Sequence, residues 1–351
     1  MRFLLFIVIV FAFVGGFFFL RSDKKSTKEP VQKAAVQSIE AEKESPVEGY
    51  IFVPYWTIDS DLSSSPYDII YFGISATKNG IDYEDQGYKN LDSFSKVRGE
   101  KKSFLAVRML DSDVNLAVLK DKNLQENIAN EAIQIARSNN FSGIILDLEI
   151  QGLPFESFIK SITSFNALFS KRSHEQNISF AALLYGDVFY RIRPYDVGQI
   201  SKETDRVFVM AYDFSKAKGD PGPNFPLEGK DTYGYDFKTM TSDFLKEVPK
   251  NKLTIIFGMF GYDWTVDEKS QTKGTASSKS TFGFEKFVTQ CTDSDSCTIT
   301  NSDMYGTKIT YQKDGEKHVI FFENNRSVEK KKEFLYSKGL KSFSYWAYSF
   351  F

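Results

Sequence analysis

The residues with the clearest catalytic potential are two carboxylates, Asp147 and Glu149, at the end of an apolar run over residues 143–148. Such a run is typical of a buried strand, and residues two apart on a strand point to the same face of the sheet. Two carboxyl groups held together in apolar surroundings raise each other's pKa, so Glu149 would hold a proton at neutral pH and act as a general acid. The same spacing also fits a carboxylate that caps the next helix or pairs with an arginine, and both interpretations stay open.

Two other apolar runs also end in side chains suited to sugar chemistry. The sequence Met210-Ala211-Tyr212-Asp213 places a phenol and a carboxylate at the end of residues 206–212. Residues 342–345 are followed by Trp346, whose indole can stack on the face of a sugar ring. Taken singly, a Tyr-Asp pair is common in turns and a lone Trp is more often part of a core. Neither of these explanations predicts that all three groups meet at one mouth.

The chain from Gly49 onwards alternates short apolar runs with amphipathic stretches. Helix candidates include residues 123–139, residues 155–171 behind Pro154, and residues 328–338 with Ser327 as N-cap and Gly339 as C-terminal stop. Alternating strands and helices indicate an α/β fold, and eight such units predict a (β/α)8 TIM barrel, whose active site lies at the C-terminal ends of the strands. The eight predicted strands are residues 50–55, 69–74, 103–109, 143–148, 178–184, 206–212, 253–259 and 342–345.

Residues 263–323 interrupt this alternation with polar strand candidates at residues 298–300 and 308–311. We expect them to form an inserted α+β subdomain between strands 7 and 8 of the barrel. Without the insertion, residues 49–351 come close to the roughly 250 residues typical of this barrel.

Composition excludes several function classes. The 351 residues include 44 Lys and Arg against 46 Asp and Glu, a balance that argues against a general nucleic-acid binder. Two Cys and two His are too few for the usual zinc site, so we expect chemistry without a metal or other cofactor. Cys291 and Cys297 can form a disulfide in an oxidising compartment or remain two thiols.

Together these motifs resemble glycoside hydrolase family 18, the chitinase-like barrels. The signature of that family on the fourth strand, Asp-x-x-Asp-x-Asp-x-Glu, aligns with Ser142, Ile145, Asp147 and Glu149, of which only the last two match. Its Met-x-Tyr-Asp motif on the sixth strand is matched by Met210, Tyr212 and Asp213, and its tryptophan on the eighth strand by Trp346.

The resemblance extends over nearly all of residues 49–351 and is greatest to the spore-cortex and cell-wall lytic N-acetylglucosaminidases. Val53-Pro54-Tyr55-Trp56 is similar to the first strand of that branch, and residues 258–264, with Tyr262, are similar to its seventh. Residues 322–327 and 344–347 are similar to its C-terminal part. The branch adds Tyr55, Trp56 and Tyr262 to the candidate substrate-binding residues, beside Asp213, Met210 and Trp346.

The resemblance implies hydrolysis of β-1,4-linked N-acetylglucosamine bonds in peptidoglycan or chitin-like glycans, with retention assisted by the substrate. Glu149 would protonate the glycosidic oxygen, Asp147 would orient the 2-acetamido N–H, and Tyr212 would hydrogen-bond the acetamido oxygen. The alternative is an inactive, lectin-like carbohydrate-binding protein on the same barrel. Ser142 and Ile145 favour this alternative, because the family residue at position 145 supports Asp147 from below.

The N-terminal segment predicts the location of the protein. Residues 3–20 are apolar over about the length that spans a bilayer, and no small-residue cleavage pattern follows them. We therefore expect a membrane anchor at residues 1–21 and a linker at residues 22–48. Positive charges after the span favour a cytoplasmic body. The short N-terminal flank and a wall substrate favour an extracytoplasmic catalytic domain, which we expect, or a secreted one if the segment is cleaved.

The C-terminal end predicts an uncovered seam in the barrel. Phe351 is only five residues after Trp346, which leaves no room for an eighth outer helix. Within the linker, Val31, Ala34, Ala35 and Ile39 recur at helical spacing, and we expect this stripe to pack into the seam. The sequence does not predict an oligomeric state.

Overall fold

The computed structural model describes residues 48–58, 61–291 and 296–351. The predicted anchor, nearly all of the predicted linker and the Val31–Ile39 stripe lie outside the described residues, so these expectations stay predictions. Within the described ranges, no helix is both long enough and apolar enough to cross a membrane.

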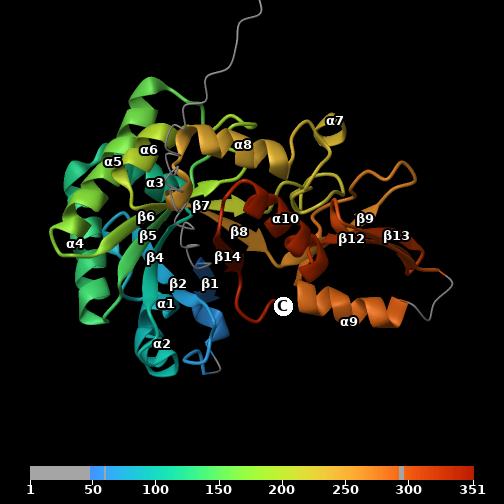
Figure 1. Cartoon of the computed structure of the whole chain (residues 1–351), viewed down its shortest axis with the longest axis horizontal. Helices are drawn as coiled ribbons and strands as arrows, with labels where there is room; N and C mark the ends of the chain where they lie inside the picture. Colours follow the sequence, from blue (N-terminus) through green and yellow to red (C-terminus); the bar gives the residue numbers. More distant parts are fainter. Residues whose placement is uncertain (1–47, 59–60, 292–295) are drawn as a thin grey trace, which may run out of the picture. The chain divides into compact units, whose positions relative to one another are not determined.

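Eight parallel strands form a closed barrel, because β1 pairs with both β2 and β14 (Figure 1). Each of the eight predicted runs corresponds to one of these strands, and the predicted barrel is confirmed. In barrel order the strands are β1 (Glu48–Pro54), β2 (Asp68–Thr77), β4 (Ser103–Met109), β5 (Gly143–Leu148), β6 (Ser179–Tyr185), β7 (Arg206–Ala211), β8 (Leu253–Gly258) and β14 (Ser342–Trp346).

Helices cover the outside of the barrel between successive strands (Figure 1). The first unit differs from the prediction, because the described residues between β1 and β2 form only the 3-10 helix η1 (Tyr55–Thr57). The hairpin strand β3 (Gly80–Ile81) precedes the first α-helix. The helices on the barrel are α1 (Gln86–Lys89), α2 (Leu91–Arg98), α3 (Ser112–Lys120), α4 (Lys122–Ser138), α5 (Glu156–His174), α6 (Val197–Glu203), α7 (Lys230–Tyr233), α8 (Phe237–Glu247) and α10 (Asn325–Ser337), with the 3-10 helix η2 (Lys250–Lys252) before β8.

The prediction of Ser327 as the N-cap of the last helix is wrong. Helix α10 is capped by Asn324, whose side chain accepts a hydrogen bond from the Ser327 N–H, while Ser327 Oγ accepts one from the Asn324 N–H. Ser327 is therefore the third residue of a capping box, a place where its hydroxyl serves the cap equally well. Gly339 follows the helix at φ 76°, as expected of its C-terminal stop.

Side chains of β5 alternate between two apolar layers. Ile144 and Leu146 point outwards and pack against the helices. Ile145 points inwards, where it is fully buried among residues of the other barrel strands, including Phe52 and Phe208. Asp147 shares the inward parity of Ile145 and is only 3% exposed.

The expected α+β insertion is present between β8 and β14 and lies on the right in Figure 1. Its antiparallel sheet has the order β10-β9-β13-β12-β11, and Phe284 of its helix packs against Ile309 and Ile320 of the sheet. Cys291 and Cys297 form a disulfide with Cα atoms 5.6 Å apart. The elements are β9 (Phe260–Val266), β10 (Ser277–Ser280), α9 (Thr281–Cys291), β11 (Thr298–Ser302), β12 (Gly306–Lys313) and β13 (Glu316–Phe322).

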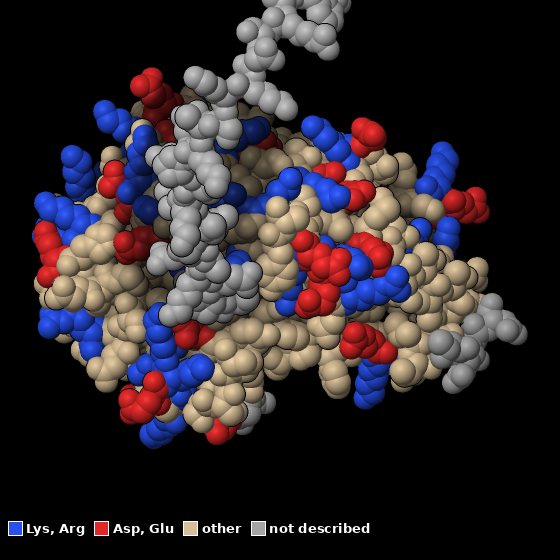
Figure 2. Space-filling view, viewed as in Figure 1, with Lys and Arg blue, Asp and Glu red and all other residues tan. Residues whose placement is uncertain are grey.

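Charged side chains of both signs are interspersed on the face shown in Figure 2, without one large basic or acidic field. One ion pair is instead fully buried, between Glu323 and Lys331, whose side chains are 2% and 0% exposed. Glu323 directly follows β13, Lys331 belongs to α10, and Thr281 Oγ1 of α9 donates to the Glu323 carbonyl. The pair therefore joins the insertion to the barrel.

We expect Glu323→Gln to lower the free energy of unfolding by about 3 kcal/mol, because it leaves the Lys331 ammonium buried without its counterion. The double variant Glu323→Gln/Lys331→Met removes that charge and should recover most of the loss. Urea unfolding measures both values. Glu333→Gln, which breaks an exposed pair with Lys330 on the same helix, is the control and should leave the free energy of unfolding nearly unchanged. If Glu323→Gln were as stable as Glu333→Gln, the stabilising role of the buried Glu323–Lys331 pair would be contradicted.

Candidate active site

A cleft of about 440 Å³ opens at the C-terminal ends of the barrel strands. Seven of the nine predicted site residues line it, namely Asp147, Glu149, Tyr212, Asp213, Trp346, Trp56 and Tyr262. The structure adds lining residues that sequence reasoning did not select as site residues, namely Phe72, Leu110, Leu183, Phe260, Ser278, Lys279, Ser280 and Phe350. Three of these, Ser278 to Ser280, belong to β10, so the insertion forms one wall of the cleft.

Asp147 of β5 and Glu149, which directly follows β5, lie together in this cleft, as their spacing predicts. Burial raises the pKa of Asp147 well above its usual value, and the nearby charge of Glu149 adds to the rise while Arg108 opposes it. Burial also raises the pKa of Glu149, against a hydrogen bond that the Tyr185 hydroxyl donates to its Oε2 at 2.8 Å. Asp147 Oδ1 is buried and has no hydrogen-bond partner among the described residues. Both carboxyl groups therefore bind their protons more tightly than ordinary carboxyl groups do.

The backbone that carries Glu149 is fixed by two side chains from other elements. Asn115 Nδ2 of α3 donates to the carbonyls of Met109 and Glu149 at 2.7 and 2.8 Å. The Tyr195 hydroxyl donates to the Leu148 carbonyl and accepts from the Ile150 N–H, both at 2.7 Å. These contacts set the direction in which the Glu149 side chain leaves the strand.

Asp213 follows β7 in a left-handed conformation, with φ 56°. Its N–H donates to Asn224 Oδ1 at 2.8 Å, and its Oδ1 accepts a hydrogen bond from the Tyr262 hydroxyl at 2.7 Å. Burial raises the pKa of Asp213, while the Tyr262 hydrogen bond lowers it. Tyr262 belongs to β9, so this bond connects the insertion directly to the rim of the barrel.

Aromatic rings surround the two carboxylates. The ring centroids of Trp346 and Phe72 are 4.7 Å apart in an edge-on arrangement. The ring centroids of Trp346 and Tyr212 are 6.4 Å apart, with the two planes inclined by 28°. Trp56 is 54% exposed at the rim. These rings offer flat apolar faces beside polar groups, as sugar-binding sites do.

Two predicted site residues lie outside the lining of the cleft. The Tyr55 ring packs against Arg108, whose guanidinium carbon is 5.0 Å from the ring centroid. The Tyr55 carbonyl accepts a hydrogen bond from the Asn90 side chain. Met210 is 6% exposed and packs inside the barrel, where it lines a smaller recess next to Glu149. Tyr55 is the first residue of η1 and Met210 is a residue of β7 below the rim, which explains these positions.

Comparison with known proteins identifies the family. Residues 8–350 match the model of the glycosyl hydrolases family 18. The chain belongs to this family. It is 22% identical over 232 residues to the putative sporulation-specific glycosylase YdhD of Bacillus subtilis, covering 65% of this chain and 52% of the relative. It is 23% identical to the cortical fragment-lytic enzyme of the same organism, covering 65% and 51%.

This family 18 chain spans about half the length of these two curated relatives. Among solved structures, it is similar to the Group IV chitinase of Ostrinia furnacalis in complex with allosamidin, with a TM-score of 0.70 and 16% identity over 86% of this chain and 92% of that one. Family membership and the barrel it shares with chitinases support a glycosidase.

The two departures from the family signature lie at different depths of β5. Ser142 directly precedes the strand, at the end far from the cleft, and its carbonyl accepts hydrogen bonds from the N–H and hydroxyl of Ser179. Ile145 lies two residues before Asp147 on the same inward face and is fully buried. Only the second departure changes the surroundings of the carboxylates.

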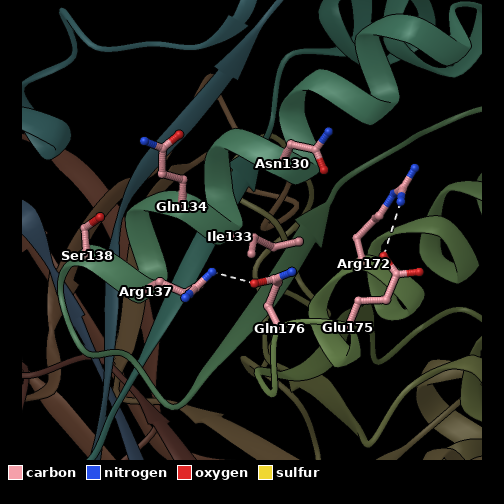
Figure 3. Close-up of a pocket in the computed structure, with 8 residues that line it drawn as sticks. All are labelled: Asn130, Ile133, Gln134, Arg137, Ser138, Arg172, Glu175 and Gln176. Carbon is pink, nitrogen blue, oxygen red and sulfur yellow. Dashed lines mark hydrogen bonds and ion pairs between the residues drawn. The ribbon is translucent and has the colours of Figure 1, made fainter.

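A larger hollow of about 570 Å³ lies elsewhere on the family 18 barrel, between the C-terminal parts of α4 and α5 (Figure 3). Its polar side chains partner one another, as in the bonds from Arg137 to Gln176 and from Arg172 to Glu175 (Figure 3). Helices run back along a barrel, so their C-terminal ends lie opposite the catalytic mouth. None of the predicted site residues lines this hollow.

The described residues contain no group of three or more His, Cys, Asp or Glu side chains arranged to hold a metal ion.

We expect Asp147→Asn to stabilise the protein at neutral pH. The raised pKa means that the fold disfavours the ionised carboxylate, so the wild type loses stability as pH rises above the usual carboxyl pKa of 3.8. A neutral amide avoids this loss and should add about 1 kcal/mol or more at pH 8, with a smaller gain at pH 4. Thermal unfolding at both pH values measures the difference. The exposed Asp92→Asn is the control, and a pH-independent effect of Asp147→Asn would contradict the assignment.

Proposed function

We propose that this protein hydrolyses β-1,4 bonds of N-acetylglucosamine residues in peptidoglycan or related chitin-like glycans, by a retaining mechanism in which the substrate supplies the nucleophile. The observation that supports it most directly is the meeting of Asp147, Glu149 and Tyr212 beside Trp346 in one cleft. The names of the Bacillus subtilis relatives, a sporulation-specific glycosylase and a cortical fragment-lytic enzyme, favour a cell-wall glycan.

In this mechanism Glu149 donates its proton to the glycosidic oxygen as the bond to the leaving sugar breaks. The acetamido oxygen of the sugar above Trp346 attacks its own anomeric carbon and forms an oxazolinium ion. Asp147 accepts a hydrogen bond from the acetamido N–H and stabilises its positive charge, and the Tyr212 hydroxyl donates to the acetamido oxygen. Glu149, now ionised, takes a proton from a water molecule whose oxygen attacks the anomeric carbon. This attack opens the oxazolinium ring and gives a product with retained anomeric configuration.

Asp213 and Tyr262 have a supporting role in this proposal. Their hydrogen bond leaves one Asp213 oxygen for a sugar hydroxyl at the rim. Trp56 offers a further stacking face. We also propose that the apolar N-terminal segment anchors the protein and presents the barrel outside the cytoplasm, where such glycans occur.

We expect Glu149→Gln to reduce the release of reducing ends from purified peptidoglycan and chito-oligosaccharides at least about a thousandfold, because the amide cannot donate the proton. Its affinity for the same glycans should stay within a few-fold of the wild type, since the amide is isosteric. Reducing-end assays and calorimetry measure the two quantities. Glu156→Gln, an exposed glutamate at the start of α5, is the matched control.

The outcome against this proposal is a folded wild-type protein that binds the glycans and cleaves none of them. That result would favour the lectin-like alternative on the same barrel.

We expect Tyr185→Phe to shift the alkaline limb of kcat/KM to higher pH. The Tyr185 hydroxyl stabilises the ionised form of Glu149, so its loss raises the pKa of Glu149 further and keeps the acid protonated to higher pH. The loss of one hydrogen bond to a charged group corresponds to about one pH unit. A pH profile on a soluble oligosaccharide measures the shift. Tyr190→Phe, in the segment that follows β6, should leave the profile unchanged, and a downward shift in Tyr185→Phe would contradict the assignment.

A further inference from the structure

A small recess of about 80 Å³ adjoins the cleft beside Glu149. Glu149, Tyr212 and Asp213 line both spaces. Trp346 lines the cleft but not the recess. The recess therefore lies on the side of Glu149 away from Trp346. If one sugar stacks on Trp346 and Glu149 protonates the bond to the next, the leaving sugar lies on the side of the recess. Its volume is too small for another sugar ring and suits a substituent.

Most of the charged groups around this recess already have partners. Arg193 is 4% exposed and binds both oxygens of Asp187 at 2.8–3.0 Å. Arg191 also donates to Asp187, at 2.7 Å. The Asp213 carboxylate is engaged by Tyr262.

Lys216 is the exception among the cations of this recess. Within the described part of the chain, its ammonium group makes no hydrogen bond and no ion pair, although the side chain is partly buried. Burial and the neighbouring charge of Arg193 lower the pKa of Lys216, and the charges of Asp187 and Asp213 oppose this. The charge of Lys216 in turn acts to lower the pKa of Glu149 and Asp213. A partly buried cation without a partner favours the entry of an anion.

We propose that Lys216 binds a carboxylate carried by the leaving-group sugar, as on the 3-O-lactyl group of N-acetylmuramic acid, and thereby selects anionic wall glycans over neutral chitin-type chains. This inference rests on the proposed function. The lactyl carboxyl is ionised only where no peptide is attached, because a stem peptide converts it to an amide. The preferred substrate is therefore a glycan strand from which an amide hydrolase has already removed the peptides.

The test compares two substrates with the full chain. One is a glycan strand freed of peptides by an amidase, and the other is a neutral chito-oligosaccharide of similar length. We expect Lys216→Gln to lower kcat/KM on the peptide-free strand about tenfold or more and to change the value on the neutral substrate less than about threefold. Lys216→Arg should keep most of the preference. Lys218→Gln, an exposed lysine two residues further on, is the matched control.

The ratio of the two kcat/KM values is the readout, because a general effect of Lys216 on Glu149 or on folding changes both substrates equally. An equal loss on both substrates, or an unchanged ratio, overturns the role of Lys216 and leaves the hydrolase proposal intact.

Binding measured in the Glu149→Gln background separates the two proposals. If the wild type cleaves neither substrate but the peptide-free strand binds about tenfold more weakly without Lys216, the hydrolase proposal fails and the Lys216 site stands. If removal of Lys216 leaves that binding unchanged, the site is overturned.

Discussion

Removing the carboxyl groups of Asp147 and Glu149 from water at the end of a barrel strand costs free energy, and the contacts around the site offset part of that cost. Asp147 and Glu149 are taken out of water by an interior of Ile145, Phe72 and other apolar side chains, and ionised carboxylates are costly in such surroundings. The fold offsets part of this cost with the Tyr185 hydroxyl and the nearby Arg108 charge, but it leaves the pKa of both groups raised. Both carboxyl groups therefore keep their protons to higher pH than ordinary carboxyl groups do.

The insertion takes part in the site as well as enclosing it. Tyr262 of β9 donates to Asp213, and β10 supplies the wall with Ser278 to Ser280. Near Tyr262, at the same end of the insertion sheet, Glu323 forms the buried pair with Lys331 of α10. These contacts anchor the barrel-proximal end of the insertion and hold Tyr262 within hydrogen-bond distance of Asp213.

The barrel and the central site residues were predictable because local patterns determine them. Continuous apolar runs mark parallel strands, and polar residues that end such runs mark the mouth, which located Asp147, Glu149, Tyr212 and Trp346. Tyr185, Asn115 and Tyr195 were missed because their roles depend on contacts between elements far apart in the sequence. Ser327 was misplaced because Asn and Ser are both good N-caps, and only the geometry of the capping box distinguishes them.

Ile145 illustrates how a departure from a signature acquires a physical meaning in the structure. From the sequence, it removes a hydrogen-bond partner below Asp147, and Asp147 Oδ1 indeed lacks a partner among the described residues. A buried carboxylate oxygen without a hydrogen-bond partner gains more from an incoming N–H donor than an oxygen that already accepts a hydrogen bond. The new hydrogen bond does not have to displace an existing one. In the proposed reaction that donor is the acetamido N–H of the substrate. The aliphatic side chain thus leaves Asp147 less stable in the empty cleft and increases what substrate binding can contribute.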